Sequence, residues 1–543
     1  MPSQKRTGRP TSTTTTATAF RAFSISGSPF QTCLCIIVVL LSWAYLYLHV
    51  VVGPTPNHRT TEAEFSSSGR EETGMAGMGT SVTPESVASV MLRWHGLELA
   101  GPSRRIQTLW AGYGSISELR ARPIATTTTT TTADAERLQE EEEDLKLILK
   151  LVTPPDGLAA AGRAKADEGH ARKMLSYEVE QYFYEAVAPR LTSRGKGAKD
   201  SDSDDPPPPA VARCIATTRG LRTEDDQEAG DRNRPDGAAE LLRHGVVATL
   251  IEDLRPAFPV EPGGKGARET LDRRQVRAAL DWLAAFHGLS RAWVPRRGED
   301  PEFEALVRPP LEEVERRRRG ITAGDGDGAR NSTVWLNGGY TYLATRRKEY
   351  AALEADADSE WSSALCAPSS PGGGRAMAER VAEVLRPRGR DARPQESYVH
   401  GDVKSENLFA TTGGDRVAFF DFQYVGLGLG GCDLAKLFTC SVPLGLLTDR
   451  GRDTMPRQLA MDAGERGLLE EYRARLLRVG GGAAAAVEYE WALFVRHWEA
   501  ALVDWLRFQM SWGAWGNTEW LEARVRSILS DDEFKKWLLS ETT

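Results

Sequence analysis

The segment Tyr398–Tyr424 constrains this chain most strongly, because it places three polar side chains at one end of a predicted hairpin. Two short apolar runs, one starting at Asn407 and one ending at Phe420, flank a turn with consecutive glycines, a pattern typical of a β-hairpin. A hairpin returns the chain to its starting point, so we expect Asp421 to lie beside Asn407 and Asp402. Two carboxylates and an amide oxygen are hard ligands of the kind that Mg²⁺ takes together with substrate phosphates.

The same segment resembles the aminoglycoside phosphotransferase and choline kinase superfamily. The resemblance rests on the string His400-Gly401-Asp402-x-x-x-x-Asn407, followed by Asp421-Phe422-Gln423 and Cys432-Asp433-Leu434-Ala435. The DFQ ending and the CDLA string are most similar to the ecdysteroid kinase-like, or CHK kinase-like, branch. The resemblance extends over roughly residues 90–530 and implies a two-lobed, protein-kinase-like fold that uses ATP and Mg²⁺ to phosphorylate a hydroxyl of a small molecule.

The resemblance implies a role for each of these residues. Asp402 would accept the proton of the substrate hydroxyl, while Asn407 and Asp421 would hold Mg²⁺ between the phosphates of ATP. His400 would brace the catalytic loop. Asp433 would act structurally behind that loop.

Lys404 opens an alternative, because a lysine at this place after the catalytic aspartate is typical of protein kinases, where it contacts the transferred phosphate. Two features oppose a protein kinase. Gly401 stands where that class has arginine, and the stretch between Asp421 and Asp433 is too short for a long activation segment. A nucleotide-binding pseudokinase is a further alternative, but no residue of the predicted catalytic set is missing.

The first half of the predicted domain supplies candidates for binding ATP. Lys150 lies in the apolar strand LKLILKLV, and the resemblance implies that it contacts the phosphates; Lys146, on the same face of the strand, is the alternative. The helix that contains Glu180 resembles the family's helix whose glutamate pairs with that lysine, and Glu178 and Glu185 are the alternatives.

Two further segments complete the predicted nucleotide site. Gly112, Gly114 and Ser115 form a turn whose backbone N–H groups would cover the phosphates. Glu252 and Leu254 resemble the hinge between the lobes, where backbone groups would bind adenine. His287, in a long helix ahead of the catalytic loop, is expected to be structural.

Strand-like segments precede helix-like ones along the chain, which predicts an α+β protein of two lobes. Helical spacing begins near Pro84. The other predicted elements are two strands around a glycine turn in Leu109–Ile124, strands at Leu145–Val152 and Val246–Ile251, and a helix at Ala171–Leu191. Three inserted loops are expected, at Ala125–Asp134, Arg194–Ala210 and Ala323–Arg330.

Composition argues against several classes of protein. The net charge is −8, and no concentrated basic face suggests a nucleic-acid partner. The basic run Arg316–Arg319 follows several acids and is expected to be a solvated helix end. The 6 cysteines include no CxxC pair and no Cys/His cluster with metal-ligand spacing, so neither a disulfide framework nor a structural zinc site is expected.

The N-terminal region predicts a membrane anchor. Thr32–Val52 contains no Asp, Glu, Lys or Arg and is about as long as a helix that crosses a hydrocarbon core. Basic residues precede it and few follow, which places the N-terminus in the cytosol. A cleaved organelle presequence is the alternative, because no acid occurs before Glu62. The predicted regions are a basic tail (1–31), a membrane span (32–52), a linker (53–85), an N-lobe (86–254) and a C-lobe (255–543).

The C-terminal helices are expected to carry the substrate site. Four tryptophans recur there every seven residues and share one helix face: Trp491, Trp498, Trp505 and Trp512. They are expected to form a core stripe, with an aromatic wall for an apolar or cationic substrate as the alternative. Asn331-Ser332-Thr333 is a glycosylation sequon that matters only if the domain is lumenal.

Overall fold

The computed structural model describes residues 82–542, except for 110–111, 125–143, 154–166, 194–207, 220–236, 238–240, 242–244, 264–269, 321–332, 369–373 and 480–488. These residues belong to one unit, Thr80–Thr543. The predicted span Thr32–Val52 lies outside the described residues, as do the N-terminal tail and most of the inserted loops. Within the described part, none of the helices combines the length and the apolar character needed to cross a membrane.

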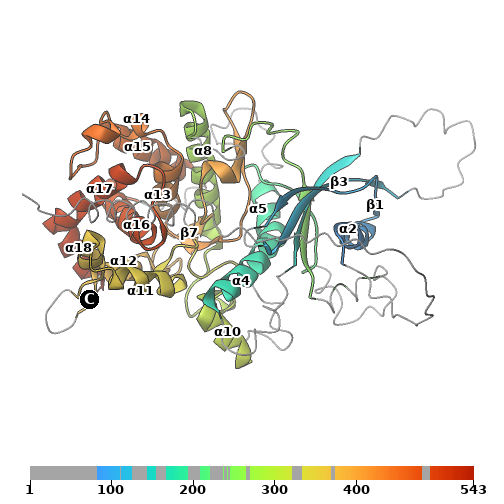
Figure 1. The fold of residues 1–543 in the computed structure, drawn as a ribbon, viewed down its shortest axis with the longest axis horizontal. Helices are drawn as coiled ribbons and strands as arrows, with labels where there is room; N and C mark the ends of the chain where they lie inside the picture. Colours follow the sequence, from blue (N-terminus) through green and yellow to red (C-terminus); the bar gives the residue numbers. More distant parts are fainter. Residues whose placement is uncertain are drawn as a thin grey trace, which may run out of the picture. The chain divides into compact units, whose positions relative to one another are not determined.

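An antiparallel sheet forms the first lobe (Figure 1). The described strands are β1 (Leu97–Leu99), β2 (Arg104–Thr108), β3 (Gly114–Pro123), β4 (Leu145–Val152), β5 (Cys214–Thr217) and β6 (Val247–Glu252). They follow the order β1-β3-β4-β6-β5, with β2 paired to β3. The strands predicted at 145–152 and 246–251 are present. The first of the two strands predicted within Leu109–Ile124 was placed wrongly: β2 lies wholly before Leu109, because Leu109 already belongs to the turn.

Alternation along β4 creates two different faces. Leu147, Leu149 and Leu151 are buried against a core that includes α2 (Pro84–Arg93). Thr83 caps α2, and Pro84 occupies its first turn, where a missing N–H costs nothing. Side chains at alternate positions of β4 point the other way, which turns Lys150 toward the second lobe.

The helix predicted at Ala171–Leu191 is present as a continuous helical run with a local irregularity. α4 (Glu168–Tyr182) passes into a π-helical turn, Phe183–Val187, and then into α5 (Ala188–Ser193). Asp167 caps α4 by accepting hydrogen bonds from two backbone N–H groups of the first turn. Figure 1 shows α4 between the sheet and the helices of the second lobe.

The second lobe is helical and carries two small two-stranded sheets. Its helices are α8 (Arg273–Ser290), α9 (Pro301–Glu304), α10 (Pro310–Arg318), α11 (Arg347–Ala355), α12 (Met377–Leu385), α13 (Gly431–Cys440), α14 (Leu444–Leu447), α15 (Ala463–Arg478), α16 (Trp491–Trp512), α17 (Thr518–Ser530) and α18 (Asp532–Thr542). Its strands are β7 (Ser397–Val399), β8 (Leu408–Ala410), β9 (Val417–Phe419) and β10 (Gly426–Gly428). The predicted α+β architecture of two lobes is therefore confirmed.

The basic run of α10 differs from its prediction. Arg316 and Arg317 both contact the buried Glu313, and Arg317 also reaches Glu178 on α4 at 2.9 Å. Only the last two arginines of the run are exposed. The run is thus partly a bridge between two helices, because an acid distant in sequence meets it.

Candidate active site

The β8–β9 hairpin forms as predicted, with each strand one residue shorter. The Phe420 N–H donates to the Asn407 carbonyl at 3.0 Å, which returns the chain to Asn407 just before Asp421. β7 leads into His400 and pairs with β10, so the catalytic loop is held between two short sheets.

Asp433, in the first turn of α13, anchors the loop from behind. Its carboxylate accepts hydrogen bonds from the His400 N–H at 2.7 Å and from the Gly401 N–H at 2.9 Å. His287 lies 3.1 Å from the same carboxylate and 2.7 Å from the Tyr472 hydroxyl, and it is buried. This buried network is consistent with a structural role for His287 and Asp433.

His400 connects the two ends of the hairpin. Its Nε2 lies 3.0 Å from the Phe420 carbonyl, and the Asp402 N–H donates to its Nδ1 at 3.2 Å. Burial lowers the pKa of His400, so the ring is neutral at pH 7. Gly401 has a φ of +86°, and a Cβ there would collide with the Tyr424 carbonyl oxygen, so only glycine fits.

The Asp402 carboxylate is held by two side chains from its own loop. Asn407 Nδ2 donates to it at 3.0 Å and to the Asp402 carbonyl at 2.8 Å. Lys404 Nζ lies 3.0 and 3.2 Å from its two oxygens. Asp402 is 7% exposed, so these contacts hold a largely buried carboxylate.

Lys150 joins the two lobes at this site. Its ammonium group lies 2.7 Å from Glu180 of α4 and 2.9 Å from Asp421. The alternatives are placed elsewhere, since Lys146 is exposed and Glu178 pairs with an arginine of α10. The third candidate, Glu185, contacts Arg219 at 2.7 Å.

The charges of this group favour an ionised lysine and aspartate. Burial alone would lower the pKa of Lys150, but Asp421 and Glu180 raise it above its usual value. Burial opposes ionisation of Asp421, yet Lys150 holds its pKa below the usual range. Burial raises the pKa of Glu180 to about 7, although Lys150 acts in the opposite direction.

Asp421 adopts an unusual backbone conformation. Its φ is +65°, and among the described residues no other non-glycine residue has a positive φ. Strained backbone of this kind persists where the surroundings demand it, and functional sites are common places for it. Phe422 stacks on Phe183 of the π-helical turn with ring centroids 3.6 Å apart, which holds the conformation in place.

Gln423 is a site residue whose contacts the sequence alone did not indicate. Its Nε2 donates to Asp421 Oδ1 at 2.6 Å, and its Oε1 accepts from the Ser176 hydroxyl of α4 at 2.9 Å. Gln423 therefore fixes the orientation of Asp421 relative to the first lobe. Gln423 belongs to the DFQ string, but its contact with Ser176 could not be predicted because the two residues are far apart in the sequence.

The glycine turn lies between β2 and β3, as predicted. Gly112 and Gly114 have positive φ values, and a Cβ on Gly114 would collide with the Leu151 carbonyl oxygen of β4. Ser115, the second residue of β3, pairs with Leu151. The turn is thus packed against the strand that carries Lys150.

The predicted hinge follows β6. The exposed Glu252 lies 3.3 Å from Arg213, and the Leu254 carbonyl accepts from the Phe258 N–H at 2.9 Å. Arg255 ties this segment to the sheet through Asp253 at 2.6 Å and Glu118 at 3.0 Å. The contact between Glu252, Leu254 and adenine stays a prediction.

The donor set fits a small hard cation. Asn407 uses its amide nitrogen for Asp402, and Asp421 uses Oδ1 for Lys150 and Gln423. Asn407 Oδ1 and Asp421 Oδ2 therefore keep their lone pairs, as Mg²⁺ shared with phosphates requires. No cluster of three or more His, Cys, Asp and Glu side chains in the described part of the chain could hold a metal by itself.

The tryptophans of α16 are divided between two environments. Trp498 and Trp505 are buried in the core, as expected for a core stripe. Trp512 is 52% exposed and packs against Arg346, whose guanidinium lies 5.2 Å from its ring centroid. Trp491 is half-buried, so the tryptophan stripe is buried in the middle of α16 and more exposed at both ends of the helix.

The catalytic hairpin and its supports lie within a stretch with a recognisable family signature. Residues 232–475 match the phosphotransferase enzyme family. The match includes Asp402, Asn407 and Asp421 but not Lys150 or Glu180. It confirms the expected enzyme class, a phosphotransferase, whereas the CHK kinase-like branch stays a prediction. Among curated proteins, none matches the chain.

The solved structures that match this chain include several phosphotransferases. An aminoglycoside phosphotransferase described as putative, from Ralstonia eutropha, is 14% identical with a TM-score of 0.32 and covers 84% of this chain and 98% of its own. Macrolide 2'-phosphotransferase MphH from Brachybacterium faecium is 12% identical (TM-score 0.31; 81% and 96% covered), and choline kinase LicA from Streptococcus pneumoniae is 11% identical (TM-score 0.27; 82% and 93% covered).

Proposed function

We propose that this chain is an ATP- and Mg²⁺-dependent phosphotransferase that transfers the γ-phosphoryl group to a hydroxyl of a small molecule. The observation that carries the proposal is Lys150, which bridges Glu180 of one lobe and Asp421 of the other. A half-buried lysine held between two carboxylates is a fixed positive charge at which phosphates can bind. Asp402 lies in the loop that leads into the hairpin before Asp421 and is bound there by Asn407, and an acceptor hydroxyl would be activated at this loop.

The residues divide the work of the reaction. The acceptor oxygen forms a bond to the γ-phosphorus as the bond to the β-phosphate oxygen breaks, and Asp402 takes the hydroxyl proton. Asn407 and Lys404 keep the Asp402 carboxylate oriented for this transfer. Mg²⁺, when bound by Asn407 and Asp421, would neutralise charge on the phosphates. Positioning of the reactants supplies most of the rate in such reactions.

The stretch after Asp421 favours a small acceptor over a protein. It forms β10 and enters α13 at Gly431, so the chain returns to the core at once. No long segment for binding a peptide lies between Asp421 and Asp433, all of which the structure describes. Lys404 contacts the catalytic carboxylate itself, and its presence is therefore compatible with either acceptor class.

The test is transfer of labelled γ-phosphate from Mg-ATP by the full chain. The acceptors are a small-metabolite extract and, separately, a protein extract. Asp402→Asn is compared with Asp415→Asn, an exposed aspartate in the turn of the same hairpin. We expect label in small molecules with the wild type and Asp415→Asn, and at least 100-fold less with Asp402→Asn. Label in proteins alone would show a protein kinase, and no label despite ATP binding would refute the proposal.

We also propose, from the sequence, that Thr32–Val52 anchors the chain in a membrane with the N-terminus in the cytosol. The test is membrane fractionation with alkaline washing, followed by glycosidase treatment. A washed membrane pellet that retains the chain at full length would support the anchor. A shorter chain in the soluble fraction would support a cleaved presequence instead.

A further inference from the structure

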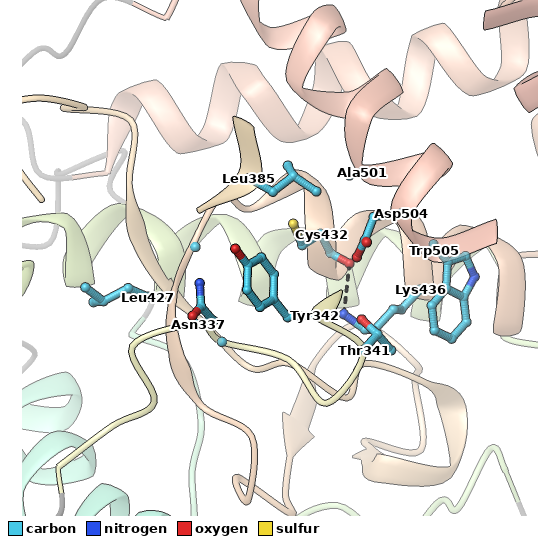
Figure 2. A pocket seen from close by; sticks show the side chains of 12 residues that line it. Asn337, Thr341, Tyr342, Leu385, Leu427, Cys432, Lys436, Ala501, Asp504 and Trp505 are labelled. Atoms are coloured by element: carbon cyan, nitrogen blue, oxygen red, sulfur yellow. Dashed lines mark hydrogen bonds between the residues drawn. The ribbon is translucent and has the colours of Figure 1, made fainter. Parts of the chain in front are cut away.

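A small cavity lies between α13, α16 and the segment that precedes α11 (Figure 2). It has room of about 20 Å³ for a water-sized sphere, enough for one water molecule or one hydroxyl group. The polar side chains in its wall include Asn337, Lys436 and Asp504. These groups lie outside the catalytic set, and their hydrogen bonding is incomplete.

Lys436 is the main anomaly. Lys436 is only 3% exposed, and among the described residues its ammonium group donates one hydrogen bond, to the Cys432 carbonyl at 3.4 Å. The Trp505 ring centroid lies 5.8 Å away. A buried ammonium group has three donors, and leaving them without acceptors is costly. The cavity therefore requires an oxygen that accepts from Lys436.

Asn337 adds a second donor and Asp504 an acceptor. The Asn337 amide nitrogen is buried and has no partner among the described residues. Arg507 donates twice to Asp504 Oδ1, at 2.8 and 3.0 Å, which leaves Oδ2 without a partner in the described part of the chain. Figure 2 shows the Asp504 carboxylate and the Lys436 ammonium directed toward each other. In the described part of the chain no ion pair joins them, and both side chains line the cavity.

The required occupant has the hydrogen-bonding capacity of an alcohol. It accepts from Lys436 and Asn337 and donates to Asp504, which a hydroxyl oxygen does with its two lone pairs and one proton. A halide or carboxylate would accept from both donors but would be repelled by Asp504. A cationic group would be repelled by the positive charge of Lys436.

The cavity adjoins the catalytic loop. A Cβ built on Gly339 would lie 3.2 Å from Lys436 Nζ and 3.7 Å from the Gly401 carbonyl oxygen, so the two groups flank one point. α13 supports the loop on either side of Lys436. Asp433 binds the start of the loop, and the Ser441 hydroxyl accepts from the Ser405 N–H at 2.7 Å.

We propose that this cavity is the inner end of the acceptor site, where Lys436, Asn337 and Asp504 bind a second hydroxyl group of a polyhydroxylated, uncharged acceptor. This inference rests on the proposed phosphotransfer. It names the class of acceptor, a polyol or sugar-like compound, and it assigns Lys436 and Asn337 as residues that determine specificity. A water molecule fills the same position when no acceptor is bound.

The first test is the chemical identity of the labelled products from the metabolite extract, determined by mass spectrometry. We expect products that carry at least one free hydroxyl besides the phosphorylated one and no fixed positive charge. Phosphorylated products limited to single-hydroxyl cations, such as phosphocholine, would overturn this inference and leave the phosphotransferase standing. Absence of any phosphorylated small molecule would instead refute the proposed function, and this inference with it.

The second test compares Lys436→Met and Asn337→Ala with Lys348→Met, the same change at an exposed lysine of α11. The substrates are the acceptor so identified and its analogue lacking the second hydroxyl. We expect each cavity variant to raise KM for the acceptor at least tenfold and to leave KM for ATP within twofold. The ratio of kcat/KM for the acceptor to kcat/KM for its deoxy analogue should fall at least tenfold. Thermal unfolding checks that each variant is folded. If Lys436→Met does not fold, Asn337→Ala alone provides the test. Lower kcat with an unchanged acceptor KM would show that the cavity holds only a structural water.

Discussion

A buried ion pair in the C-lobe gives the sharpest test of how this fold is held together. Glu465, in the first turn of α15, is fully buried and accepts from Arg524 Nε of α17 and from Trp498 Nε1 of α16, each at 2.8 Å. One carboxylate thus connects three helices. Glu465→Gln keeps the shape of the side chain and removes its charge.

The expected loss of stability depends on the partners that Arg524 keeps after the substitution. Arg524 is 2% exposed, and after the substitution its remaining acceptors in the described part of the chain are the Leu459 carbonyl at 2.9 Å and a neutral amide. Breaking one partner of a buried pair typically costs about 3–5 kcal/mol, because the remaining charge is uncompensated. We therefore expect Glu465→Gln to lower the free energy of unfolding by about 3–5 kcal/mol.

The measurement is urea unfolding of the full chain followed by tryptophan fluorescence. Glu533→Gln is the matched control, since Glu533 pairs with Lys536 at 2.7 Å on the surface and should give no measurable change. Adding Arg524→Met to Glu465→Gln removes the uncompensated charge, and the double variant should recover part of the loss. Equal unfolding midpoints for Glu465→Gln and Glu533→Gln would refute the reasoning.

Three further predictions concern the site, the pH dependence and the loop. Gln423→Leu removes a hydrogen bond to the charged Asp421 that is worth about 1.5–3 kcal/mol. The kcat should therefore fall about 10- to 100-fold, whereas the Kd for ATP should stay within threefold. An unchanged kcat would contradict the role of Gln423. Burial, aided by nearby arginines, lowers the pKa of His497 to about 3, below its unfolded value, so stability is complete above pH 6.5 and falls as the pH decreases toward 3. Between pH 7 and pH 5 the wild type should lose about 2 kcal/mol more than His497→Gln in denaturant unfolding, and parallel losses would exclude this explanation. Gly401→Ala should lower the melting temperature and abolish transfer because of its positive φ, whereas Gly467→Ala on α15, where a Cβ meets nothing within 4 Å, should do neither.

The parts of the site that could be predicted are local in sequence. The β8–β9 hairpin follows from two apolar runs and a glycine turn, and it brings Asp402, Asn407 and Asp421 together without knowledge of the rest of the chain. Lys150 and Glu180 were reached through the resemblance, since a strand lysine and a helix glutamate are individually unremarkable. The structure then distinguishes them from Lys146, Glu178 and Glu185 by their contacts.

What could not be predicted depends on partners far apart along the chain. Ser176 and Gln423 meet across 247 positions, and Arg255 and Glu118 across 137. Polar residues of these types carry no periodic signal that would reveal such contacts. The exposure of Arg316 and Arg317 was overestimated for the same reason, because Glu178 lies on another helix.

The bond between Lys150 and Asp421 spans 271 positions, and this separation matters while the protein is being made. At about 5–20 residues per second, a ribosome needs on the order of tens of seconds to add the residues between them. During that interval the emerging first lobe has Lys150 and Glu180 but lacks the second carboxylate. A nascent chain can therefore build its sheet early, but Lys150 gains its second carboxylate only after Asp421 has emerged, when more than three quarters of the sequence has been made.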